Sequence, residues 1–378
     1  MIHSRRTRTA ALAPILLLAL AGTTPAAAAG ATAVPMDSPR WSFQAVESQV
    51  EEHLGRQSLR LKGGAARLED LDFSDGIIEF DVAFGPERGF CGVGWRVQGP
   101  GSFEHFYLRP HQSGKPDSLQ YTPNFNGVAG WQLYHGAGYG AAVELLAGEW
   151  LHVKLVVSGG QAEAFVDSDE PVLFMHELKR GTASGGLALV VADFAPAYFS
   201  NFSYQAVEAP PLRSDPRKLP EAPAGTVEEW SVSAAFDGAS LDGRFALEDA
   251  DTRDLEWEVL ASEASGIANL ARIQGVREGA DTAFVRLILT SERAQTRLLR
   301  FGYSDRVRVY LGRELLYSGD NGFQSRDFRY LGTIGLFDGL PLRLAAGENE
   351  LLFAVSESFG GWGIQAAFED GEGIRVRP

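Results

Sequence analysis

The sequence predicts an all-β protein in which two antiparallel β-sandwich (jelly-roll) domains are joined by a proline-rich linker. Short runs of alternating apolar and polar residues recur along the chain, separated by the turn residues Gly, Asp, Pro and Asn. Long runs with the 3.6-residue period of a helix are nearly absent. Residues 208–225 contain five prolines with charged residues between them, which is typical of a stiff, extended linker.

Each predicted strand of the first half has one apolar face. In residues 77–84 every second residue is apolar, whereas Glu79 and Asp81 lie on the opposite face, which we expect to be solvated. The only cysteine, Cys91, has the parity of its apolar neighbours, so we expect a small core residue without a disulfide. The predicted strands of this half are residues 76–84, 90–97, 105–111, 150–157, 162–167 and 186–191.

The second half also has the pattern of successive strands. Apolar residues alternate along 306–311, and Gly312 with Arg313 is expected to form a tight turn into the next strand. One short helix is predicted, over residues 262–270. The predicted strands of this half are residues 282–290, 295–303, 306–311, 342–344 and 349–356.

Charge and the N-terminal pattern restrict the partners and the location. The 378 residues carry a formal net charge of −15, and no basic run follows the first residues. A nucleic-acid partner is therefore not expected. Arg5, Arg6 and Arg8, an apolar run over 10–21 and small residues at 26–29 form a signal-peptide pattern. We expect an exported protein, periplasmic or extracellular, without a membrane span, because the apolar run is too short for one.

The segment 104–111 carries the strongest functional signal. One face of this strand holds His105, Tyr107, Arg109 and His111, and the alternate apolar residues face the core. Sugars present hydroxyl groups at their edges and C–H groups on their faces, so planar polar groups and aromatic platforms suit them. We therefore predict a saccharide-binding site on this face. Its candidate ligand-binding residues are Arg96, Tyr107, Arg109, Tyr121, Asn124, Trp131 and Tyr134.

Other interpretations of this face stay open. The same pattern fits a polar network that is satisfied internally, or a module that binds another protein. A third alternative is an enzyme acting on glycosides, with His105 or His111 transferring a proton and Arg109 stabilising an oxyanion. A metal site at the histidines is disfavoured, because Arg109 lies between them and repels cations. No cofactor is expected, except that three hairpin-tip carboxylates would suit a structural calcium ion. They are Asp167, Asp169 and Asp193.

Four motifs follow one another in the first half: Gly-x-Ile-x-Phe-Asp-Val at 76–82, Trp-x-His-Val at 150–153, Val-Asp at 166–167 and Phe-x-Asn-Phe at 199–202. Through them, residues 41–206 resemble the concanavalin A-like lectin/glucanase superfamily, in particular laminin G-like modules and the 3-keto-disaccharide hydrolase-like branch. The resemblance implies a β-sandwich shared by lectins, glycosidases and adhesion modules, and an enzyme of that branch would be a hydrolase or lyase. The glucanase motif E-x-D-x-x-E is broken, because Phe84 stands where the last acid belongs.

The segments 306–313, 345–351 and 363–368 make the second half similar to a galactose-binding-like jelly roll. That family usually has Asn-Gly after Val-Tyr-Leu, so the Gly312–Arg313 pair predicts a shortened hairpin. The expected organisation is a signal peptide at 1–29, a concanavalin A-like sandwich at 38–206, a linker at 207–226 and a galactose-binding-like sandwich at 227–372.

Overall fold

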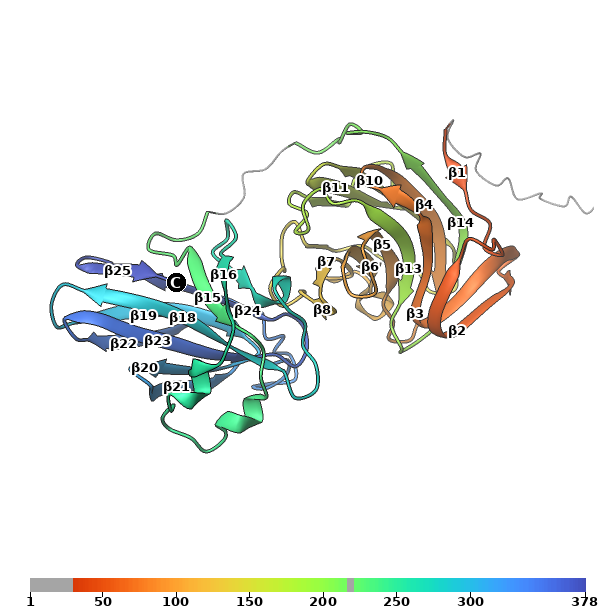
Figure 1. Ribbon diagram of the computed structural model, residues 1–378. Coiled ribbons are helices and arrows are strands. Elements are labelled where there is room, and N and C mark those ends of the chain that lie inside the picture. Colours follow the sequence, from red (N-terminus) through yellow and green to blue (C-terminus); the bar gives the residue numbers. More distant parts are fainter. Residues whose placement is uncertain (1–29, 216–220) are drawn as a thin grey trace, which may run out of the picture.

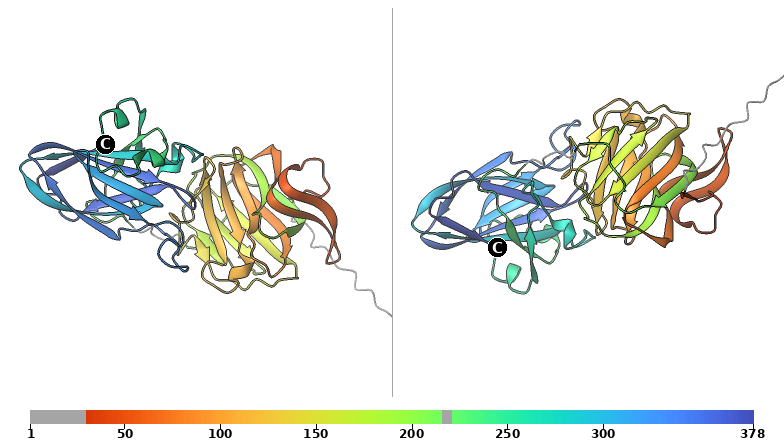
Figure 2. Two further views of the ribbon diagram at one scale, coloured as in Figure 1. Left: turned by 90° about the horizontal axis from the view of Figure 1, so that it is seen from below. Right: turned by 90° about the horizontal axis from the view of Figure 1, so that it is seen from above.

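The computed structural model describes residues 30–215 and 221–378. The predicted signal peptide at 1–29 and residues 216–220 of the predicted linker lie outside the described residues. The described chain forms two β-sandwiches that pack against each other (Figures 1 and 2), which confirms the all-β prediction. Within the described ranges, no helix combines the length and the apolar character that crossing a membrane would require.

The first sandwich is one curled antiparallel sheet with a core between its two layers. The long strand β3 connects the layers, because its first half pairs with β14 and its second half with β13. The strands run in the order β12-β11-β10-β4-β14-β3-β13-β5-β6-β7-β8. Their bounds are β1 Thr32–Ala33, β2 Ser42–His53, β3 Arg56–Phe73, β4 Gly76–Phe84, β5 Cys91–Val97, β6 Phe103–Leu108, β7 Leu119–Phe125, β8 Val128–Ala129, β9 Gly140–Ala141, β10 Leu151–Ser158, β11 Gln161–Val166, β12 Leu173–Met175, β13 Gly185–Val191 and β14 Ala197–Ala206.

This core is formed by the alternate residues of each strand that point to the inner side of the sheet. Ile78, Phe80 and Val82 are fully buried, as their spacing predicts. Cys91 lies in the same core, and burial raises the pKa of its thiol to about 12, so it is an inert core residue. The strand predicted over 105–111 ends earlier, at Leu108, because Pro110 begins a 3₁₀ turn and has no N–H for a sheet ladder.

The second sandwich packs a seven-stranded sheet on a four-stranded one. The first has the order β16-β15-β18-β23-β20-β21 with β25 beside β18, and the second has the order β17-β24-β19-β22. A shared core lies between them. The bounds are β15 Glu229–Ser233, α1 Ala250–Arg253, β16 Trp257–Ala261, β17 Ala268–Asn269, β18 Thr282–Ser291, β19 Gln295–Ser304, β20 Arg306–Leu311, β21 Glu314–Asp320, β22 Asp338–Leu344, β23 Gly347–Ser356, β24 Gly363–Phe368 and β25 Ile374–Arg377.

Two local predictions for this half have opposite outcomes. Gly312 and Arg313 form the expected tight turn between β20 and β21, with φ angles of 56° and 72°. The helix predicted over 262–270 is wrong. Gly266 has a φ of 85° in a turn that Glu263 and Ile267 close by a 2.8 Å backbone hydrogen bond, and the chain then enters β17.

Candidate functional site

The outward face of β5, β6 and β7 carries a row of rings, which we call the ring face: Phe103, His105, Tyr107, Phe90 and His111. Successive ring centroids lie 5.6, 4.8, 6.0 and 5.1 Å apart. Tyr107 is 7% exposed, whereas the other four rings are partly exposed. The row is therefore a continuous aromatic surface at the spacing of favourable ring contacts.

Polar groups accompany the rings. Tyr107 Oη donates a 2.9 Å hydrogen bond to Gln120 Oε1 on β7, and Arg109 forms an ion pair with Asp117. Three buried nitrogen atoms on or beside this face have no hydrogen-bond partner among the described residues: His105 Nε2, Arg109 Nε and Asn124 Nδ2. Buried polar atoms without partners raise the free energy of the folded state, so they mark the places where a polar ligand gains most.

Desolvation lowers the pKa values of the two histidines of the row. Burial lowers the pKa of His105 to about 3, so its imidazole is neutral over the ordinary pH range. Burial also lowers the pKa of His111, with Arg109 and Arg88 adding to the shift. Uncharged rings suit stacking and hydrogen bonding, whereas a base with a pKa near 3 accepts protons poorly at neutral pH.

Arg96 does not belong to this face, in contrast to the prediction. Its side chain is 0% exposed and donates to the carbonyls of Ser74, Gly159 and Gly181, with an ion pair to Asp75 at 3.0 Å. The cause is a β-bulge. Two residues of β5, Trp95 and Arg96, lie opposite one residue of β13, Leu187, and Arg96 has a φ of 51°, so the period-two count fails here.

Tyr121 also faces elsewhere, because it lies on the inward face of β7 and is fully buried in the core. Its hydroxyl donates a 2.6 Å hydrogen bond to Glu104 and accepts one from the Lys179 amide. Burial raises the pKa of Glu104, which also accepts a hydrogen bond from the Arg180 amide. Tyr121 therefore supports the core polar network and is not positioned to contact a ligand.

Trp131 and Tyr134 lie where the two sandwiches meet. The Trp131 ring contacts Phe323 and Phe359 of the second sandwich at 5.9 and 5.7 Å. Tyr134 is buried and donates a hydrogen bond to Glu263 of the second sandwich. Loop aromatics that were predicted to stack on sugars are thus used in the contact between the sandwiches.

A buried ion cluster strengthens that contact. Glu263 of the second sandwich pairs with Lys179 of the first and with Arg272, each at 2.8 Å. Arg272 also donates to the Lys179 carbonyl at 2.9 Å. The guanidinium groups of Arg180 and Arg272 lie 5.0 and 4.5 Å from the centre of the Phe125 ring. The sandwiches are therefore joined by charged, aromatic and backbone contacts.

Asp81, one of the two acidic residues of β4, is buried and Glu79 is only partly exposed, which corrects the prediction of a solvated face. Asp81 is 4% exposed and accepts hydrogen bonds from Arg56 and Asn201. His152 on the neighbouring strand β10 lies 2.8 Å from Asp81 and 3.8 Å from Glu79. Hydrogen bonds to Asp81 and Glu79 raise the pKa of His152 to about 9. These carboxylates belong to a closed charge network on the other layer of the sandwich.

Of the three residues considered for calcium, Asp167 and Asp193 use their carboxylates in other contacts, and Asp169 uses its backbone carbonyl. Asp167 accepts a 2.7 Å hydrogen bond from the His152 amide, and Asp193 lies 3.5 Å from Lys62. The Asp169 carbonyl accepts a hydrogen bond from Arg213. Among residues 30–215 and 221–378, no group of three or more His, Cys, Asp or Glu side chains is arranged to hold a metal ion.

Sequence reasoning missed two members of the ring face. Phe90 precedes β5 with the parity of Gly92 and Gly94, so the period-two count could have placed it beside Tyr107. Phe103 fills the space above Gly94, where an added Cβ atom would lie 2.9 Å from its ring. The space above that glycine is thus occupied by an aromatic side chain.

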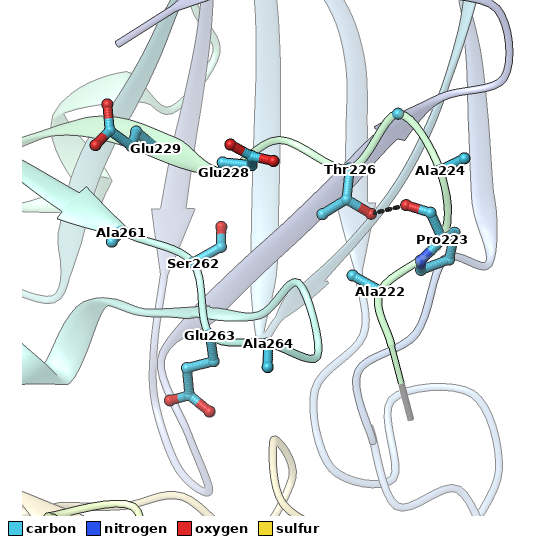
Figure 3. A pocket seen from close by; sticks show the side chains of 11 residues that line it. Ala222, Pro223, Ala224, Thr226, Glu228, Glu229, Ala261, Ser262, Glu263 and Ala264 are labelled. Atoms are coloured by element: carbon cyan, nitrogen blue, oxygen red, sulfur yellow. Dashed lines mark hydrogen bonds between the residues drawn. The ribbon is translucent and has the colours of Figure 1, made fainter. Parts of the chain in front are cut away.

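The second sandwich has two cavities of about 560 Å³ each. One is lined by residues 222–226, 228–229 and 261–264, which are mostly small (Figure 3). Its Glu263 carboxylate points away from those of Glu228 and Glu229 and is already engaged by Lys179 and Arg272. The other cavity lies on the outward face of β20, β21 and β23.

Comparisons with known proteins give only distant likenesses. No protein-family model and no curated protein matches the chain. The carbohydrate-binding module CBM66 from Bacillus subtilis is 17% identical and has a TM-score of 0.34. The likeness covers 47% of this chain and 95% of the module. A Bacillus subtilis protein of unknown function with a galectin-like fold is 12% identical (46% and 94% covered, TM-score 0.35). SCLam, an endo-β-1,3(4)-glucanase, is 10% identical (48% and 93% covered, TM-score 0.32).

Proposed function

We propose that the chain is an exported saccharide-binding protein whose sugar lies on the ring face of the first sandwich. The sugar ring stacks on the partly exposed rings of His105 and Phe90. The nitrogen atoms of His105, Arg109 and Asn124 that lack partners are shielded from solvent, so sugar hydroxyl groups pair with them as neighbouring side chains move aside. Export is proposed because residues 1–29 have a signal-peptide pattern, and cell fractionation tests it.

The observation that carries this proposal is the combination of a continuous row of rings with three unpartnered nitrogen atoms. A core face would bury such rings fully, and an ordinary solvated face would pair or expose its polar atoms. The low pKa of His105 favours binding over proton transfer. Of the residues predicted to bind, Tyr107, Arg109 and Asn124 lie at this face.

Binding to a glycan panel, followed by calorimetry on the best ligand, tests the proposal. We expect His105→Ala and Phe90→Ala each to weaken binding at least about fivefold, as the loss of one ring contact implies. Trp150→Ala is the matched aromatic control, because Trp150 lies under Arg56 near the other layer. Equal losses in all three variants, or no glycan bound, would contradict the proposal. Release of a cleaved sugar would indicate an enzyme instead.

A further inference from the structure

The ring face continues past Phe90 at one end of the first sandwich. Phe194, in the loop between β13 and β14, has its ring centroid 5.5 Å from that of Phe90 and is 55% exposed. The ring of His111, which follows β6, lies 5.1 Å from Phe90 on the same face. These three rings, which we call the platform, are all at least partly open to solvent.

A guanidinium group without an acidic partner lies over the platform. The exposed Arg88, in the loop between β4 and β5, has its guanidinium carbon 4.8 Å from the centre of the Phe194 ring and 5.7 Å from that of Phe90. Within residues 30–215 and 221–378, its side chain forms no hydrogen bond or ion pair. Contact with rings orients the planar guanidinium and leaves its N–H groups free, and such a fork binds a carboxylate through two hydrogen bonds.

The carboxylates of the neighbouring loops are engaged or turned away. Asp117 forms an ion pair with Arg109, and Asp193 lies 3.5 Å from a lysine ammonium group. Glu87 is exposed, and its carboxylate is turned back over Gly85, where an added Cβ atom would lie 2.0 Å from it. The guanidinium over the platform therefore keeps a positive charge that these carboxylates do not neutralise.

His111 reports the sign of the electrostatic potential at the platform. Burial lowers the pKa of its imidazole, Arg109 and Arg88 lower it further, and Asp117 raises it by less than either arginine lowers it. The potential is thus positive here, although the whole chain carries a formal net charge of −15. Open aromatic rings in a positive potential suit a ligand that has an apolar face and an anionic group.

We propose that the platform makes the ring face selective for acidic saccharides, in which a uronate ring stacks on the platform and its carboxylate accepts two hydrogen bonds from Arg88. This inference rests on the proposed saccharide-binding function and adds the class of sugar. A carboxylate is planar and matches the guanidinium fork, so we place a uronate here rather than a sulfated sugar.

Calorimetry on the full chain tests the inference with oligomers of galacturonate, glucuronate and mannuronate, each compared with its neutral methyl ester. We expect the best acid to bind at least about tenfold more tightly than its ester, because hydrogen bonds between charged groups are the stronger ones. The ratio of the two affinities should decrease as the salt concentration rises, since the contact is exposed.

Arg88→Gln is expected to reduce the acid-to-ester ratio to about one. Arg343→Gln is the matched control, because Arg343 is an exposed arginine on β22 of the second sandwich, and the ratio should persist in it. Phe194→Ala should weaken both acid and ester about fivefold, as the loss of one ring contact implies.

Three results would overturn this inference and leave the proposed function intact: neutral glycans or esters that bind as tightly as the acids, an acid preference that survives Arg88→Gln, or tighter binding of a sulfated oligosaccharide. If neither these oligomers nor any member of the glycan panel binds, the proposed function itself fails, and the inference fails with it.

Discussion

The ammonium group of Lys179, in the first sandwich, lies 2.8 Å from the carboxylate of Glu263, in the second. Both side chains are buried, with 1% and 8% exposure. Burial alone would favour their neutral forms, yet their attraction keeps both charged: the pKa of Lys179 is raised and that of Glu263 is lowered. The pair therefore exists only while the sandwiches stay in contact.

Glu263→Gln is expected to lower the free energy of unfolding by about 3 kcal/mol, because it leaves the Lys179 and Arg272 charges without their buried partner. Urea denaturation measures the change. Arg300→Gln is the control, since the Arg300–Glu369 pair is exposed and should contribute less than about 1 kcal/mol. Similar effects of the two substitutions would show that the contact between the sandwiches contributes little to stability.

Arg96→Lys is expected to destabilise the protein by about 3 kcal/mol while leaving glycan affinity unchanged per folded molecule. A lysine cannot reproduce the planar guanidinium that contacts Ser74, Asp75, Gly159 and Gly181 together. Denaturation and calorimetry on the same sample separate the two effects. A selective loss of affinity would instead assign Arg96 to the binding site.

His152 makes stability depend on pH on the alkaline side. Asp81 and Glu79 raise its pKa to about 9 in the folded state, against about 6.5 in the unfolded chain. The stabilisation is therefore complete below pH 6.5 and is lost as the pH rises through 9. Because the ring is partly exposed, we expect less than about 1 kcal/mol. Urea midpoints at pH 6 and pH 9.5 should differ more in the wild type than in His152→Gln.

His105 makes the stability of the fold depend on pH on the acidic side of neutrality. Its folded pKa of about 3 is below the unfolded value near 6.5, so acid protonates the unfolded chain first. Stability should consequently fall as the pH drops from 6.5 towards 3, by less than the limiting slope of about 1.4 kcal/mol per pH unit because the ring is partly exposed. His105→Phe keeps a ring in the row and removes the titrating group. If both proteins respond identically to acid, His105 is not buried in its neutral form.

The sequence was sufficient for much of the fold and for part of the site. Alternation along 76–84 reproduces the bounds and inward residues of β4, because a half-buried strand must alternate. The same reasoning correctly groups His105, Tyr107 and Arg109. It fails at Arg96, because one extra residue in β5 shifts the parity and only the pairing with β13 reveals it.

Trp131 and Tyr134 could not be placed from the sequence for a different reason. Their neighbours, Phe359 and Glu263, are more than a hundred positions away, so local pattern gives no sign of the contact. A glycine-rich loop with rings has the same composition whether it meets a sugar or another sandwich. Only the packing of distant segments separates these cases.

The contact between the two sandwiches also links their unfolding. The Lys179–Glu263 pair and the contact of Trp131 with Phe323 each use one group from either sandwich. Unfolding of one sandwich therefore leaves buried charges and rings of the other without their partners. The two sandwiches consequently form one cooperative unit rather than two that melt separately.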